Sequence, residues 1–179
     1  MSSATHLAAV LESKGSPFNI TQRPTPKPGP NKILIEVKSL AINPIDNYVR
    51  EAGFMINSYP PVPGSDIAGT IIAAGSSVPS SAAQVGACVL AFAPCFYTGG
   101  EPNYGAFQEK VLVPYQNACL LPSATTFNQG AMLPVAVVTT WAGINYSTGL
   151  QTNAQFSESN KKVFLVYGGT RSLVAWLSK

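Results

Sequence analysis

The chain has 179 residues, which leaves room for one full domain and part of a second, because domains commonly hold about 100 to 200 residues. Charged residues make up only 11% of it, and the net charge of +3 comes from 11 Lys and Arg residues that form no basic run, which argues against nucleic-acid or membrane partners. No apolar run approaches the roughly 20 residues that span a bilayer, and no signal peptide is recognisable, so we expect a cytoplasmic protein.

The first part of the chain predicts β-strands. Residues 6–12 form one candidate strand, and residues 33–42 alternate apolar and polar side chains with many β-branched residues. The proline-rich residues 18–32 between them are interpreted as a connection.

A short helix is predicted directly after the second strand, over residues 43–53. Asn43 is a favourable N-cap, Pro44 fits the first helical position because its missing N–H has no helical partner there, and Gly53 is a typical stop.

The middle of the chain consists of short segments that are rich in small and β-branched residues: 64–78, 85–94 and 105–122. Many short strands at close spacing are typical of a compact barrel. We therefore predict a mainly β, partly open barrel with short helices.

The last third of the chain differs from the rest in its longer apolar stretches. Residues 126–149 are apolar over more than a strand's length and predict a helix that Pro134 interrupts. Residues 163–167 form a continuous apolar run, as in strands covered on both faces, and Gly168 and Gly169 follow it. This arrangement predicts the start of an α/β domain.

Three cysteines, Cys88, Cys95 and Cys119, are odd in number and lack C-x-x-C spacing. This pattern argues against a disulfide framework. We expect all three to be buried, reduced thiols.

Five stretches in order resemble the medium-chain dehydrogenase/reductase superfamily, in particular its zinc-independent quinone oxidoreductase and enoyl reductase branch. These stretches are Ala41–Gly53, Pro60–Val78, Tyr104–Pro114, Leu133–Ile144 and Val163–Gly169.

The resemblance implies a two-domain enzyme with a small-molecule substrate. Residues 1–125 would form the GroES-like substrate-binding domain, and residues 126–179 a linking helix and the truncated start of an NADPH-binding Rossmann domain. A full-length form would be expected to make a homodimer through the edge of its Rossmann sheet.

Zinc is not expected. Where zinc-binding relatives carry a cysteine and a His-Glu pair, this chain has Asn43, Ser65 and Asp66, none of which is a thiolate or an imidazole. Three cysteines also cannot form a four-cysteine structural site. His6 is the sole histidine, and we expect it to be solvated and without a role.

Reduction without a metal needs hydrogen-bond donors for the enolate that develops on the substrate. Asn43 and Tyr48 match the family's N-P-x-D-x-Y arrangement, which implies that both face the nicotinamide and the substrate, with Tyr48 as proton donor or polariser. Two interpretations stay open, because Asn43 is equally suited to cap the helix and Tyr48 to be a half-buried aromatic residue.

Several neighbouring residues have a structural interpretation. Asp46 suits the first turn of a helix better than the role of general base. In PGSDIAG, Gly64 and Gly69 would permit close packing and Asp66 would cap or turn the chain. Tyr104 is a candidate for the substrate pocket, with amphipathic cover as the alternative.

Cofactor contacts are implied for Thr139 and Thr140, whose alternative role is a hydrogen bond back to a helix carbonyl. Gly168 and Gly169 match the phosphate-binding turn of the family. A valine, Val174, stands where the family carries a further glycine.

Two functional hypotheses result. The first is the N-terminal part of an NADPH-dependent, zinc-independent reductase of α,β-unsaturated carbonyls, quinones or enoyl thioesters. The second is a GroES-like binding module, or a pseudo-enzyme without a working cofactor site.

Overall fold

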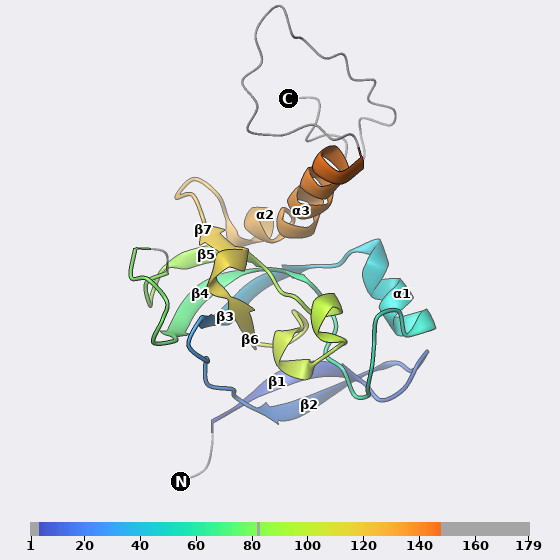
Figure 1. Ribbon diagram of the computed structural model, residues 1–179. Helices are drawn as coiled ribbons and strands as arrows, with labels where there is room; N and C mark the ends of the chain where they lie inside the picture. Colours follow the sequence, from blue (N-terminus) through green and yellow to red (C-terminus); the bar gives the residue numbers. More distant parts are fainter. Residues whose placement is uncertain (1–3, 82, 148–179) are drawn as a thin grey trace, which may run out of the picture. The chain divides into compact units, whose positions relative to one another are not determined.

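The computed structural model describes residues 4–81 and 83–147 (Figure 1). The chain divides into two compact units, residues 1–134 and 135–179. The predicted strand at 163–167 lies outside the described residues, and the predicted domain boundary at residue 125 stays a prediction.

The strands of the described residues all belong to the first unit. They are β1 (Thr5–Leu11), β2 (Phe18–Pro24), β3 (Lys32–Ala41), β4 (Asp66–Ala74), β5 (Cys88–Phe92), β6 (Lys110–Pro114) and β7 (Ala118–Leu120).

Helical elements are short and lie between or after the strands. They are α1 (Pro44–Ala52), the 3-10 turns η1 (Phe96–Thr98), η2 (Pro102–Tyr104) and η3 (Tyr115–Asn117), then α2 (Phe127–Ala131), α3 (Pro134–Ala142) and the π-helical turn η4 (Gly143–Ser147).

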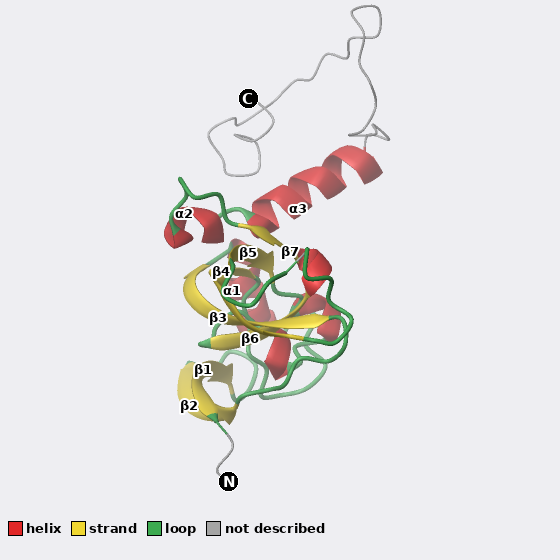
Figure 2. Cartoon of the chain, turned by 90° about the vertical axis from the view of Figure 1, so that its left-hand side faces the viewer, coloured by secondary structure: helices red, strands yellow, loops and turns green. Residues whose placement is uncertain are grey.

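The strands form two antiparallel sheets, a β1–β2 hairpin and a five-stranded sheet with the order β6-β3-β4-β5-β7. Figure 2 shows the hairpin beside the larger sheet. Main-chain hydrogen bonds from Ala9 to Phe107 and from Glu109 to Leu7 join β1 to the segment before β6. The sheets do not close into a barrel, which confirms a mainly β, partly open GroES-like fold.

Residues 18–24 correct the sequence interpretation, because they form strand β2 and not a connection. Phe18 pairs with Leu11 and Pro24 with Thr5, so the hairpin register runs over the full length of both strands. The partner strand explains the difference: a marginal strand segment becomes regular when its backbone groups find an antiparallel neighbour.

The principal core lies on one face of the five-stranded sheet. Alternate residues of β3 and β4, among them Ile33, Ile35, Ile67 and Ile71, are fully buried there. Leu34 is also buried, in a smaller cluster on the other face of β3. Strand β3 is therefore covered on both sides over its first half.

Two glycines permit the close approach that the sequence predicts for them. A Cβ atom at Gly69 would lie 2.1 Å from the main-chain oxygen of Glu36 on the neighbouring strand. Gly64 has φ +92°, and a Cβ atom there would lie 2.3 Å from the ring of Phe107. Both positions exclude a side chain.

The predicted helix with a proline interruption is two helices. The side chains of Thr126 and Gln129 form a capping box at the start of α2, and α3 begins at Pro134. Within the second unit, the side chain of Asn145 donates to the main-chain oxygen of Trp141 over 2.8 Å.

His6 contradicts the expectation of a solvated side chain, because only 2% of it is exposed. It occupies an inward position of β1, where its Nε2 lies 2.9 Å from Gln108 Oε1 and its Nδ1 lies 3.1 Å from Thr25 Oγ1. Gln108 Nε2 donates to two main-chain oxygens, so Oε1 accepts and His6 Nε2 carries the proton. A single histidine gives no sequence signal for such a polar cluster.

The expectation of buried thiols is right for Cys95 and wrong for Cys88 and Cys119, which are exposed. All three are free. Cys88 begins β5, and Cys119 lies on β7, the short strand at the edge of the five-stranded sheet.

Candidate active site

Helix α1 starts and ends where its sequence predicts. Asn43 is the N-cap with extended backbone angles, Pro44 is the first helical residue, and Gly53 follows the helix in the left-handed conformation at φ 66°. The helix buries only Asp46 and Val49. Its N-terminus therefore brings one carboxyl group inward beside Asn43.

Two buried carboxyl groups hold Asn43. Its main-chain N–H donates to Asp46 Oδ2 over 2.7 Å, and its side-chain Nδ2 donates to Asp66 Oδ2 over 2.9 Å. Asp46 is 4% exposed and Asp66 is 1% exposed. Asp66 begins strand β4, so the interpretation as a cap or turn missed its contact with Asn43.

The pKa of Asp46 is raised to about 6: burial raises it most, the hydrogen bond from the Asn43 main-chain N–H lowers it, and the charge of Asp66 adds a smaller rise. Asp46 Oδ1 and Ser65 Oγ are buried and have no hydrogen-bond partner among the described residues. Burial, followed by the charge of Asp46, raises the pKa of the Cys95 thiol to about 12. Cys95 is therefore a neutral neighbour at physiological pH.

Tyr48 lies on the solvent-facing side of α1, with 62% of the residue exposed. The alternative interpretation, in which Tyr48 is a half-buried aromatic residue, is therefore wrong. An exposed phenol in the middle of α1 is accessible to a substrate, and its part in the reaction stays a prediction.

Tyr104 is 7% exposed and packs with Leu34 and Leu112 on the outer side of β3 and β6. The ammonium group of Lys32 donates to its hydroxyl and lies 4.4 Å from the centre of its ring. This position is that of a packed residue at the sheet, and a role in a substrate pocket stays a prediction.

The candidate cofactor residues are divided between two parts of the chain. Thr139 and Thr140 lie on α3 in the second unit. Gly168, Gly169 and Val174 lie outside the described residues. The structure therefore brings Asn43, Asp46 and Asp66 together, and leaves the cofactor contacts as predictions.

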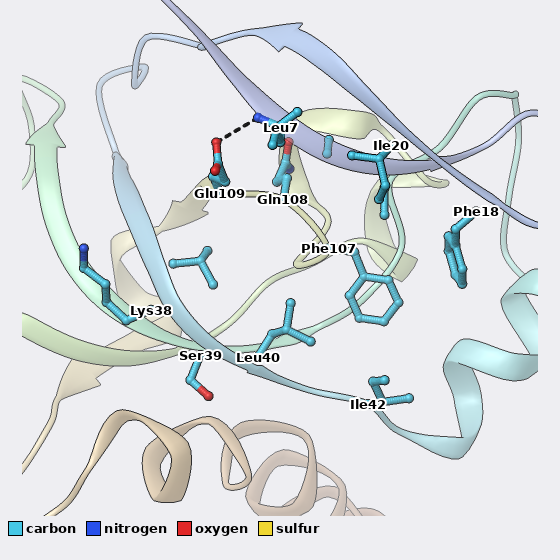
Figure 3. A pocket seen from close by; sticks show the side chains of 13 residues that line it. Leu7, Phe18, Ile20, Lys38, Ser39, Leu40, Ile42, Phe107, Gln108 and Glu109 are labelled. Atoms are coloured by element: carbon cyan, nitrogen blue, oxygen red, sulfur yellow. Dashed lines mark hydrogen bonds between the residues drawn. The ribbon is translucent and has the colours of Figure 1, made fainter.

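An apolar groove that the sequence did not predict lies beside the start of α1, with a volume of about 670 Å³ (Figure 3). The β1–β2 hairpin, the second half of β3 and residues 107–109 enclose it. Ile42, directly before Asn43, lines it and is 79% exposed, and so does Ile20, which is 63% exposed. Their exposure is a property of the folded chain, so the sequence alone gave no signal for the groove.

The polar atoms around Asn43 are an amide and two carboxylates, which hydrogen-bond to one another. Within residues 4–81 and 83–147, no group of three or more His, Cys, Asp or Glu side chains is placed to hold a metal ion.

In the same residues no helix has the length and hydropathy needed to cross a membrane.

Residues 29–123, more than half of the chain, match the model of the alcohol dehydrogenase GroES-like domain. The chain belongs to the medium-chain dehydrogenase/reductase superfamily. This finding confirms the resemblance on which the sequence interpretation rests.

Two relatives of this medium-chain dehydrogenase/reductase chain are named trans-enoyl reductases. It is 40% identical over 172 residues to a trans-enoyl reductase from Aspergillus flavipes, and the match covers 94% of this chain and 48% of that relative. It is 38% identical over 175 residues to a trans-enoyl reductase from Aspergillus terreus, which covers 95% and 56%. The chain thus spans about half the length of the curated relatives it matches.

A solved structure supports the fold of this medium-chain dehydrogenase/reductase chain. An alcohol dehydrogenase superfamily protein from Novosphingobium aromaticivorans superposes with a TM-score of 0.71 at 29% identity. The match covers 82% of this chain and 43% of that protein.

Proposed function

We propose that the chain is the substrate-binding part of an NADPH-dependent, zinc-independent reductase of α,β-unsaturated carbonyls, quinones or enoyl thioesters. The observation that carries this proposal is the side-chain amide of Asn43, held by Asp66 at the place where zinc-binding relatives have a cysteine ligand. An amide and a carboxylate provide hydrogen bonds, whereas catalytic zinc is bound mainly by thiolate and imidazole. The two trans-enoyl reductases among the relatives support the substrate class.

In this reaction the residues of the chain must stabilise the negative charge that develops on the substrate. Reduction of an enone leaves negative charge on the substrate's carbonyl oxygen, and a proton must reach its α-carbon. Asn43 retains a second amide N–H beside the one that Asp66 accepts, and Tyr48 carries an exposed hydroxyl. These are the two donors that we assign to the enolate oxygen and to the proton transfer.

A nicotinamide cofactor, when bound, supplies the hydride. The hydroxyls of Thr139 and Thr140 are of a type that fits its carboxamide or phosphate groups. Gly168 and Gly169, the proposed phosphate-binding turn, lie outside the described residues, so the preference for NADPH over NADH rests on the resemblance alone.

The remaining parts of the proposal concern the whole protein. We propose a small-molecule substrate, a cytoplasmic location and, for the longer form, a homodimer. Analytical ultracentrifugation of the full-length protein tests the dimer directly.

The test of the function compares cofactors and metals on the protein produced from its complete gene. An enone, a quinone and an enoyl thioester are each incubated with NADPH or NADH after treatment with a chelator. We expect faster consumption of NADPH than of NADH with at least one substrate, unchanged by the chelator. Consumption that requires added zinc, or a folded protein that consumes neither cofactor, would contradict the proposal, and the latter result would favour a binding module.

A further inference from the structure

The contact between Asn43 and Asp66 decides how the side-chain amide of Asn43 is turned. A carboxylate only accepts hydrogen bonds, so the NH₂ group of Asn43 must be the end that faces Asp66 Oδ2. The opposite orientation would place the amide oxygen against a carboxylate oxygen. Asp66 therefore orients a side chain that could otherwise rotate by half a turn at little cost.

The backbone at Asn43 is fixed from the same side. Asp46 Oδ2 accepts the Asn43 main-chain N–H over 2.7 Å, while Asn43 itself caps the helix that carries Asp46. Asn43 is thus held through its main chain by α1 and through its side chain by β4. Contacts with α1 and with β4 therefore both restrict the motion of Asn43.

Such a restriction matters where a donor has to meet developing charge. A donor that is already oriented needs no reorganisation during the reaction, and a misplacement of about 1 Å can cost about 100-fold in rate. Asp66 is 1% exposed, and it lies on the side of Asn43 that faces the protein core. It is therefore placed to act on the substrate only through Asn43.

The ionisable groups that face Asp46 are Asp66 on β4 and Cys95 at the start of η1. Both are acids, and the charge of Asp66 raises the pKa of Asp46. Oδ1 of Asp46, which has no partner among the described residues, is the atom that is available for a proton. The hydrogen bond of Oδ2 to Asn43 is compatible with either protonation state.

We propose that Asp66 is a positioning residue of the reductase: it accepts one N–H of the Asn43 amide and so holds the group with its second N–H presented to the carbonyl oxygen of the substrate. The carboxylate of Asp46 supports Asn43 as well, by accepting the hydrogen bond from the Asn43 main-chain N–H. The inference rests on the proposed hydride-transfer function, and it adds a residue that acts on the substrate through Asn43.

The experiment uses the full-length enzyme with an enoyl thioester and compares two variants. Asp66→Asn keeps the shape of the side chain and removes the charge that orients Asn43. The exchanged pair Asn43→Asp with Asp66→Asn restores a hydrogen bond of reversed polarity, with the donor now at position 66. Glu36→Gln serves as the matched control, because it makes the same chemical change at an exposed carboxylate of β3 that pairs with Lys38.

For Asp66→Asn we expect kcat to fall at least tenfold with little change in KM, while Glu36→Gln behaves as the wild type. In the exchanged pair we expect the melting temperature to return toward the wild-type value while kcat stays low, since position 43 no longer offers an N–H. Recovery of kcat together with the melting temperature would show a purely structural role and overturn the inference. If the exchanged pair does not fold, an Asp66→Asn enzyme with wild-type kcat overturns it alone.

A readout that needs no turnover separates this inference from the proposed function. In protein labelled with ¹⁵N, the side-chain amide protons of Asn43 should exchange slowly with solvent, and should exchange faster in Asp66→Asn. A wild-type protein with slow exchange and no reductase activity would contradict the function while leaving the orientation intact. Fast exchange in the wild type would contradict the orientation itself.

Discussion

The side-chain amide of Asn43 donates a 2.9 Å hydrogen bond to the buried carboxylate of Asp66, and this bond joins the start of helix α1 to the start of strand β4. Asn43 lies 23 residues before Asp66, and the antiparallel pairing of Ala41 with Asp66 brings the two together. The bond places a hydrogen-bonded amide at the centre of the candidate site.

Tyr48 provides the first test of the catalytic assignment. Tyr48→Phe should lower kcat of the full-length enzyme by about 100-fold or more, a usual contribution of a proton donor. Its unfolding free energy should change little, because the residue is 62% exposed. Tyr97→Phe is the matched control, since Tyr97 is 74% exposed and lies outside α1. Full activity of Tyr48→Phe would remove Tyr48 from the mechanism.

The pH dependence of stability tests the buried state of Asp46. Its pKa is about 6 in the folded protein and near its ordinary value of 3.8 in the unfolded chain, so between these pH values the folded state binds more protons. The free energy of unfolding should therefore decrease as pH rises from about 4 to about 6. Chemical denaturation across this range should show a smaller decrease for Asp46→Asn, and an identical decrease would contradict the assignment.

His6 should contribute to stability and not to activity. His6→Ala leaves Gln108 Oε1 buried without its partner, which should cost about 1 to 3 kcal/mol of unfolding free energy. Urea denaturation measures this loss, with Thr5→Ala at an exposed position of the same strand as control. A variant as stable as the wild type would show that the cluster around His6 adds nothing.

Close packing of β3 and β4 predicts a strong effect at one glycine. Gly69→Ala would place a methyl group 2.1 Å from the main-chain oxygen of Glu36, and relieving such an overlap typically costs about 1 to 3 kcal/mol. Gly29→Ala is the control, because a Cβ atom there has nothing within 4 Å. Equal melting temperatures of the two variants would mean that the strands separate easily.

Local signals in the sequence were sufficient for the ends of α1 and for the break before α3. Asn43, Pro44 and Gly53 mark the ends of α1, and Pro134 marks the start of α3, because capping and the missing proline N–H act within one turn. The glycines that permit close packing were recognised in the same way. The open, mainly β fold was predicted from strand spacing together with the resemblance.

Contacts that depend on sheet pairing could not be predicted locally. The bond from Asn43 to Asp66 requires the register of β3 on β4, and the burial of His6 requires Gln108, which is 102 residues away. The apolar groove depends on how the hairpin lies beside β3. None of these leaves a periodic pattern in the sequence.

The most direct test of the account is the position of the transferred hydrogen. The full-length enzyme is incubated with an enoyl thioester and NADPH that carries deuterium at the transferring position, and the product is examined by mass spectrometry and NMR. Reduction of the double bond predicts one deuterium at the β-carbon and an intact carbonyl group. Deuterium on the former carbonyl carbon, in an alcohol product, would contradict the account.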